Sequence, residues 1–212
     1  MKIFSIDLSS RRGSIAVVDD GAITQEIDWM ENFGNRQSLF DAMDSLKMDW
    51  ERVDLFAVGR GPGAFSGLRI GFSVVNALAA PGNKPVYALN SGVSLAARYG
   101  DECTVVMGDA RRGQVWAGLY QGIELKDDFR LMDAAEFQQM VPEDALVVSP
   151  DRDRLAELLG NYRTPSAAES VNPAAGELGK IIFQRVMDGK ASEPLEPLYM
   201  HPPVFVEPRF PA

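Results

Sequence analysis

The sequence predicts an α/β protein made of two related halves, and two observations lead to this fold class. Apolar runs of strand length alternate along the chain with segments whose apolar residues recur at helical spacing. The order of strand, aspartate, basic turn and strand also occurs twice: Asp7 precedes Arg11-Arg12 in the first half, and Asp109 precedes Arg111-Arg112 in the second. A chain of 212 residues has room for two small domains.

The first half is predicted to begin with strands and to continue with alternating helices and strands. Asp20-Gly21 between two apolar runs is a strong hairpin signal. Leu39, Met43, Leu46 and Trp50 are separated by helical offsets, which places them on one face of a helix that begins at Gln37. We predict strands over residues 2–8, 14–19, 22–28, 53–58 and 85–89, and further helices over residues 66–80 and 91–98.

The second half repeats this alternation after a boundary at Gly100-Asp101. Six of the thirteen prolines lie in the last 20 residues, so an extended tail is expected there. We predict strands over residues 103–110, 114–121 and 145–148, and helices over residues 134–140, 151–159 and 172–188. The expected units are therefore residues 1–100, residues 101–194, and a Pro-rich tail over residues 195–212.

Composition and charge exclude several classes of function. The chain carries 21 Lys and Arg against 30 Asp and Glu, a formal charge of −9, which disfavours binding of nucleic acid by this chain alone. No apolar stretch is long enough to span a bilayer, and no export signal precedes Asp7. The single cysteine, Cys103, fits a reducing compartment, so we expect a cytoplasmic protein. The single histidine, His201, excludes metal sites that need two imidazoles.

The segment VDLFAVGRGPGAFSGLRIG, residues 53–71, leads from a buried strand through a Gly-rich turn into a helix. Such a turn can aim backbone N–H groups at a phosphate. However, Gly67 is followed by Leu68-Arg69 and not by the Lys-Ser/Thr of a P-loop, and the glycine spacing does not fit a dinucleotide turn. We favour a tight turn in which Gly67 and Gly71 form a smooth helix face, directed toward either the core or a partner subunit.

Asp7 and Asp109 are the remaining candidates for chemistry. Carboxylates at the ends of two related strands can hold Mg²⁺ between phosphates, which would suit a small ATP-dependent phosphotransferase. They can equally cap turns or pair with the neighbouring arginines. The sequence leaves both alternatives open.

Four motifs in this order resemble the bacterial TsaB family over nearly the whole chain: IDLSS, GRGPGAFSGLRIG, DARRGQVWAGLYQ and EPLYMH. The resemblance implies two tandem ribonuclease H-like domains of the actin-like ATPase (ASKHA) type, with mixed sheets flanked by helices. It implies a non-catalytic scaffold in the formation of N6-threonylcarbamoyladenosine in tRNA. The family has also been labelled glycoprotease-like, which adds a peptidase as an alternative. It is the least favoured one.

The resemblance also implies partners and sites. A catalytic TsaD-like paralogue would dock on the helices at residues 37–47 and 66–80, a TsaE-like ATPase would join, and tRNA would bind only through the complex. The chain would form a homodimer when alone. It would bind no cofactor by itself, and ATP with Mg²⁺ could bind at the interface of the complex. Neither catalytic residues nor metal ligands are implied. The implied interface residues are Leu39, Met43, Leu46, Gly67, Leu68, Gly71, Val74, Val75 and Leu78.

Two further sets of residues follow from the resemblance. The family-motif loop comprises Gly61, Pro62, Gly63, Phe65, Ser66, Gly67 and Arg69, and a vestigial phosphate or Mg²⁺ site would comprise Asp7, Ser9, Asp109 and Arg111. On this interpretation, leucine at Gly67 or Gly71 should break dimerisation and leave the fold intact. The chain departs from the family pattern at Ala64, Ser66, Asn35-Arg36-Gln37 and Tyr199-Met200-His201, so the affinity for the partner does not carry over.

Overall fold

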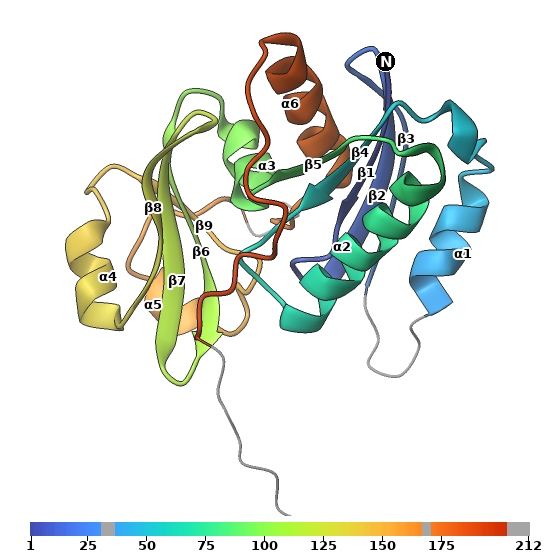
Figure 1. The fold of residues 1–212 in the computed structure, drawn as a ribbon. Helices are drawn as coiled ribbons and strands as arrows, with labels where there is room; N and C mark the ends of the chain where they lie inside the picture. Colours follow the sequence, from blue (N-terminus) through green and yellow to red (C-terminus); the bar gives the residue numbers. More distant parts are fainter. Residues whose placement is uncertain (31–36, 167–170, 203–212) are drawn as a thin grey trace, which may run out of the picture.

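The computed structural model describes residues 1–30, 37–166 and 171–202, so Asn35 and the end of the tail lie outside the described residues. A five-stranded sheet has the order β3-β2-β1-β4-β5, and a four-stranded sheet has the order β8-β7-β6-β9 (Figure 1). The strands of the first sheet are β1 (Lys2–Asp7), β2 (Arg12–Asp19), β3 (Ala22–Met30), β4 (Leu55–Gly59) and β5 (Val86–Leu89). Those of the second are β6 (Cys103–Arg111), β7 (Gln114–Gln121), β8 (Glu124–Met132) and β9 (Leu146–Val148).

Both sheets are built on one plan. In the first, β1, β2 and β3 form an antiparallel meander and β4 lies parallel to β1. In the second, β6, β7 and β8 repeat the meander and β9 lies parallel to β6. The sequence echo around Asp7 and Asp109 is thus confirmed in the topology. The sequence prediction lacked β8, because this edge strand alternates partly buried residues with charged ones and contains no apolar run.

Two helices cover the outer face of the first sheet: α1 (Gln37–Ser45) and α2 (Phe65–Ala79). The alternation of side chains along β1 determines which residues these helices cover, since Phe4 and Ile6 pack with buried residues of α1 and α2. Ile3, one position earlier in the strand, belongs to a different core on the opposite face. Both faces of the central strand β1 are therefore buried, as expected where a strand has a parallel neighbour in the middle of a sheet.

The middle layer consists of α3 (Gly92–Ala96) and α6 (Ala175–Met187), which lie between the two sheets (Figure 1). Each of these helices packs on the sheet of the other half. Helix α3, from the first half of the sequence, contacts β6 and β7, whereas α6, from the second half, contacts β1 to β4. One core cluster consequently contains Ile3 and Leu55 of the first sheet, Val106 and Val148 of the second, and Leu178 of α6. The sequence grouped α6 with the second half, but its apolar face is buried against the first sheet.

The outer face of the second sheet carries α4 (Ala134–Met140) and α5 (Ala156–Leu159). Helix α4 starts with a capping box in which the Asp133 side chain accepts from Glu136 N and the Glu136 side chain accepts from Asp133 N. The predicted helix over residues 151–159 is reduced to α5. The first helix ends at Ser45, and Trp50 lies in a separate 3-10 helix, where it packs on Phe4 at 5.1 Å between ring centroids. The prediction that Trp50 shares the α1 face was therefore wrong.

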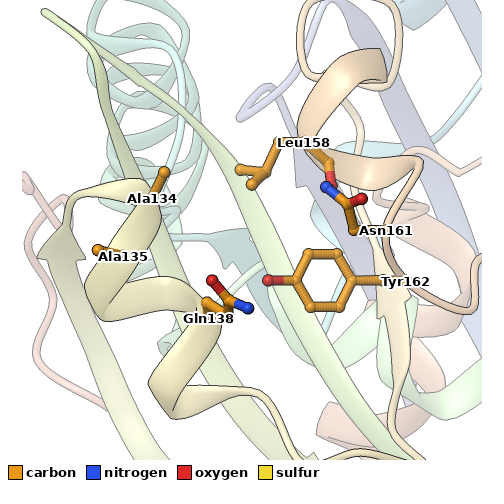
Figure 2. A pocket seen from close by; sticks show the side chains of 6 residues that line it. All are labelled: Ala134, Ala135, Gln138, Leu158, Asn161 and Tyr162. Atoms are coloured by element: carbon orange, nitrogen blue, oxygen red, sulfur yellow. The ribbon is translucent and has the colours of Figure 1, made fainter.

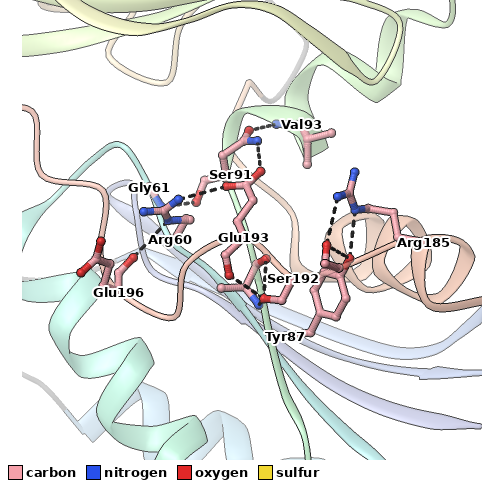
Figure 3. Close-up of polar contacts among 12 residues, drawn as sticks. Arg60, Gly61, Tyr87, Ser91, Val93, Arg185, Ser192, Glu193 and Glu196 are labelled. Atoms are coloured by element: carbon pink, nitrogen blue, oxygen red, sulfur yellow. Dashed lines mark hydrogen bonds and ion pairs between the residues drawn. The ribbon is translucent and has the colours of Figure 1, made fainter. Parts of the chain in front are cut away.

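After α6, residues 189–202 run without regular secondary structure across both halves, and we call this segment the strap. It begins along β5, where Ala88 N donates to Ser192 Oγ at 2.9 Å. Arg60 then holds it through the Glu196 carbonyl oxygen at 3.0 Å and the Glu193 carboxylate at 3.4 Å (Figure 3). At its far end, His201 Nε2 lies 2.6 Å from the carbonyl oxygen of Ala110 in β6. The strap therefore ties the first sheet to the second.

The glycines of α2 face the chain's own first sheet. A Cβ at Gly67 would collide with the carbonyl oxygen of Leu8, and a Cβ at Gly71 would lie 3.5 Å from Val58 Cγ2. Leu68 and Val75 on the same helix are fully buried. The expectation that this stripe is open to a partner was thus wrong for these four residues. Leu39 of α1 and Leu46, which directly follows this helix, are buried in the same core.

The two glycines differ in what surrounds them, which gives a matched pair of substitutions. We expect Gly67→Ala to lower the free energy of unfolding by about 1–3 kcal/mol, because backbone must move to admit the methyl group. Gly71→Ala meets only ordinary contact and gains helix propensity, so it should be neutral or stabilise by up to about 1 kcal/mol. Urea denaturation followed by circular dichroism measures both. Equal effects of the two substitutions would contradict this account.

Candidate functional site

A cleft of about 400 Å³ lies between the two halves, at the end of the first sheet where the glycine-rich turn begins α2. Six separate segments of the chain contribute to it. Its lining comprises Ser9, Ser10, Arg11, Gly63, Ala64, Phe65, Asp109, Ala110, Arg111, Trp116, Pro150, Asp151, Arg154, Tyr199, Met200 and His201. The two basic turns identified in the sequence therefore meet at one cavity.

Charged side chains of the second half form a connected network in this cleft. Asp109 Oδ2 lies 3.0 Å from Arg111 Nη1 and 3.5 Å from Arg154 Nη1. Asp109 N donates to Asp151 Oδ2 at 3.0 Å. Burial raises the pKa of Asp151 above its usual range, while the hydrogen bond from Asp109 N opposes this shift. Asp109 is thus paired with two arginines, while Asp151 is held by the Asp109 N–H and lies 4.0 Å from Arg154 Nη1.

Aromatic rings line the opposite rim of the cleft. Phe65 and Tyr199 are 57% and 42% exposed, and their ring centroids are 4.9 Å apart. The Arg69 guanidinium lies 5.2 Å from the centroid of the Phe65 ring, within cation–π range. The pair unites the start of α2 with the strap. Nothing in the sequence spacing connects residues 65 and 199.

Asp7 is buried at the end of β1, and it does not line the cleft. Its Oδ1 accepts from Ser9 N at 2.9 Å and from Ser9 Oγ at 2.6 Å. Its Oδ2 is buried without a hydrogen-bond partner. Burial raises the pKa of the Asp7 carboxyl, and the hydrogen bonds from Ser9 together with the nearby Ser91 hydroxyl partly offset that effect. Asp7 therefore acts within the described structure as the acceptor that holds the turn after β1.

The predicted vestigial phosphate or Mg²⁺ site is brought together only in part. Ser9, Asp109 and Arg111 line the cleft, whereas Asp7 lies outside its lining. Within residues 1–30, 37–166 and 171–202, no three His, Cys, Asp or Glu side chains are grouped as metal ligands would be. The donor set of the cleft is basic and does not resemble the oxygen-rich shell that Mg²⁺ requires.

The family-motif loop packs on the turn after β1 through direct backbone contact. Ala64 N donates to the Ser9 carbonyl oxygen at 2.7 Å, and a Cβ at Gly63 would collide with that same oxygen. Gly61 adopts φ +96° and its N–H donates to Ser91 Oγ at 3.1 Å. These glycines therefore allow close approach of two backbones. The interpretation of a tight turn accounts for their positions in the described structure.

The outward surface of α1 and α2 remains partly apolar. Phe40 is 60% exposed, while Met43, Val74 and Leu78 are partly buried beside the core beneath. We call these four residues the helix face. The sequence prediction included three of them and missed Phe40, because its position one residue after Leu39 put it outside the expected apolar stripe. The signal that identifies Phe40 is found in the structure, where a side chain of this size is exposed to solvent.

A second hollow of about 490 Å³ lies between α4 and the segment after α5 (Figure 2). Its lining carries only uncharged groups: Ala134, Ala135, Gln138, Leu158, Asn161 and Tyr162. It contains neither an ionised carboxylate nor a basic side chain.

In the part of the chain that the structure describes, none of the helices has the length and apolar character needed to cross a bilayer.

The burial of the Asp7 carboxylate makes the stability of the protein depend on pH. Because its folded-state pKa is raised, protonation favours the folded state, and this contribution is lost as pH rises above about 3.9, the ordinary aspartate value. Asp7→Asn keeps the acceptor for Ser9 and removes the charge. We expect it to raise the free energy of unfolding at pH 7 by about 1–3 kcal/mol.

Chemical denaturation between pH 3.5 and 7 tests this expectation, with the exposed Asp153→Asn as the control. The advantage of Asp7→Asn should grow with pH, and Asp153→Asn should follow the unsubstituted chain. A loss of stability in Asp7→Asn at pH 7 would contradict it and indicate a donor that compensates the Asp7 charge.

Comparison with known proteins gives one consistent family. Residues 37–172 match the family described as TsaD, tRNA N6-adenosine threonylcarbamoyltransferase. The chain is 30% identical over 198 residues to the tRNA threonylcarbamoyladenosine biosynthesis protein TsaB of Bacillus subtilis, with 84% of this chain and 85% of that protein covered. It is 23% identical to the protein of the same name from Escherichia coli, over 94% of each chain.

Solved structures agree with the fold. YeaZ from Pseudomonas aeruginosa superposes with a TM-score of 0.76 and 25% identity, covering 93% of this chain and all of that one (100%). The activator of the 2-hydroxyisocaproyl-CoA dehydratase from Clostridium difficile, with a TM-score of 0.51 and 8% identity, shares the fold alone over 89% of this chain and 97% of that one. The predicted α/β fold class, with two mixed sheets flanked by helices, is thus confirmed. The chain belongs to the bacterial TsaB family.

Proposed function

We propose that this chain is a non-catalytic scaffold in the formation of N6-threonylcarbamoyladenosine in tRNA, in the cytoplasm, and that it docks a TsaD-type catalytic paralogue. The relatives from Bacillus subtilis and Escherichia coli are named as biosynthesis proteins of this modified nucleoside. The single structural observation that carries the proposal is the helix face, in which Phe40 of α1 is 60% exposed and Met43, Val74 and Leu78 of α1 and α2 are partly buried.

The chemistry of the described residues supports the non-catalytic part of the proposal. The single histidine, His201, holds the strap against the Ala110 carbonyl oxygen. The carboxylates of Asp109 and Asp151 are engaged by arginines or backbone N–H. Cys103 lies at the start of β6, where burial raises the pKa of its thiol and disfavours a nucleophilic thiolate. These arrangements favour a scaffold over the phosphotransferase and the peptidase.

The helix face has the properties of a docking surface. A large aromatic side chain that is mostly exposed gains free energy when a partner covers it, and residues of this kind are frequent hot spots. The buried layer beneath, which includes Leu68 and Val75, holds α2 rigid against the sheet. The face therefore changes little on association. The same surface would join two copies of this chain when the catalytic paralogue is absent.

The formal charge of −9 supports a division of labour within the complex. Tight binding of a tRNA needs many phosphate contacts from Lys and Arg, which this chain supplies poorly. We therefore assign most of the tRNA surface to the TsaD-type paralogue and to a TsaE-type ATPase. The present chain contributes the helix face.

Phe40→Glu tests the docking proposal. We expect at least tenfold weaker binding of the TsaD-type paralogue from the same organism, and loss of any homodimer, because a charge would be buried at the interface. The matched control is Ile123→Glu, which introduces the same charge at a residue 51% exposed on the β7–β8 turn of the second half.

Calorimetric titration and size-exclusion chromatography with light scattering measure the two outcomes. Circular dichroism should show an unchanged fold for both variants, since each substituted side chain is exposed. Undiminished binding by Phe40→Glu, or equal losses in both variants, would refute the assignment of the helix face.

A further inference from the structure

We propose that Arg60, Asn90 and Glu193 form a buried polar latch, and that this latch makes the strap a two-state conformational element. With the latch closed, the strap is seated on both halves and braces the turn before α2. With the latch open, the strap is released as one unit and the turn loses its brace. The inference goes beyond the scaffold function and does not depend on it, because it concerns the free chain.

Arg60 carries a buried charge that the strap compensates. Among the Lys and Arg residues that the structure describes, Arg60 alone is buried, and its side chain is 10% exposed. Its Nη1 lies 3.4 Å from Glu193 Oε2, and its Nε donates to the Glu196 carbonyl oxygen at 3.0 Å (Figure 3). A buried charge is costly unless it is paired and hydrogen-bonded. Both groups belong to the strap, so Arg60 is stable in its buried position only while the strap is seated.

This dependence of Arg60 on the strap separates two states. In the seated state Glu193 compensates the guanidinium, and in the released state water does. A partly lifted strap would leave the guanidinium buried without its carboxylate, and breaking a buried ion pair in this way is strongly destabilising. Intermediate positions are therefore disfavoured. A partner that contacts the strap in one state only binds that state better and shifts the equilibrium toward it.

Asn90 extends the latch to the second half of the molecule. Its Nδ2 donates to Glu193 Oε1 at 2.8 Å, and its Oδ1 accepts from Val93 N at 3.1 Å and from the hydroxyl of Tyr120 in β7. Tyr120 is fully buried. Burial, with the carboxylates of Glu193 and Asp128, raises the pKa of Tyr120 well above its usual range, so the hydroxyl remains a donor. Hydrogen bonds thus connect β7 with the strap.

The backbone of the strap adds few further attachments. Glu193 N donates to the carbonyl oxygen of Ala88 in β5 at 3.1 Å, and this pairing is an isolated bridge and not a ladder. Leu198 N donates to the Arg60 carbonyl oxygen at 2.7 Å, which braces the turn before α2. Helix α2 has no side-chain cap at Ala64, so its first turn depends on this bracing. The latch therefore decides whether strap and turn stay together.

Amide hydrogen exchange of the full chain, resolved by NMR, tests the latch. In the unsubstituted chain we expect the amides of residues 193 and 198 to share one protection factor with little dependence on dilute urea, because release of the strap exposes little surface. Glu193→Gln keeps the shape of the side chain and removes the ion pair. We expect both amides to lose protection at least about tenfold, while interior amides of β1 follow global stability.

A second substitution supplies a rescue. Arg60→Met removes the buried charge and should reduce the protection of the strap at least about tenfold when made alone. The double variant Arg60→Met with Glu193→Gln leaves no charge in the latch, so we expect at least about threefold more protection than in either single variant. The matched control is Glu124→Gln, which removes the carboxylate of an exposed ion pair in β8 and should stay within about twofold of the unsubstituted chain.

Three results would overturn the latch: unchanged protection of the strap in Glu193→Gln, unrelated protection of residues 193 and 198, or additive losses in the double variant. Circular dichroism verifies the fold of each variant. Where Arg60→Met does not fold, Glu193→Gln decides alone, since its side chain is 26% exposed and tolerates the change. These measurements use no partner, so failure of the latch and failure of docking on the helix face are seen in separate experiments.

Discussion

The two sheets of this protein share one apolar core, and the positions of the cleft, the strap and the helix face follow from it. Residues of both sheets pack with α3 and α6 into a single buried cluster. This burial fixes the two halves side by side and brings the turns that contain Arg11 and Arg111 to one cavity. It also leaves α1 and α2 on the outside of the first sheet, where a partner can reach them.

Local pattern was sufficient to predict most elements, because each half is built from short strands with clear apolar runs. Prediction failed where burial depends on a distant segment. Strand β8 is an edge strand with alternating charges, so it carries little apolar signal. Helix α6 packs mainly on β1 to β4, which lie more than a hundred residues earlier, and no local period can reveal this. The direction of Gly67 toward Leu8 likewise depends on tertiary packing.

The candidate site was likewise predictable only where its residues lie close together in the sequence. Asp109 and Arg111 were identified from the sequence, since a repeated turn places them in one hairpin. The ring pair of Phe65 and Tyr199 joins positions 134 residues apart, so only the fold brings the rings together. The sequence left open whether Asp7 holds a ligand or a turn, and its burial at the end of β1, where Ser9 donates two hydrogen bonds to it, favours the turn. A carboxylate in a motif can thus have a structural role even where its sequence context suggests chemistry.

The exchange of α3 and α6 between the halves has a consequence for synthesis of the chain on the ribosome. The inner face of the first sheet is completed only when α6, residues 175–187, has left the exit tunnel, and the strap follows later still. The amino-terminal strands therefore spend most of translation with one apolar face uncovered. Closure of the fold is a late and cooperative event, and a nascent chain stalled before residue 175 is a natural client for chaperones.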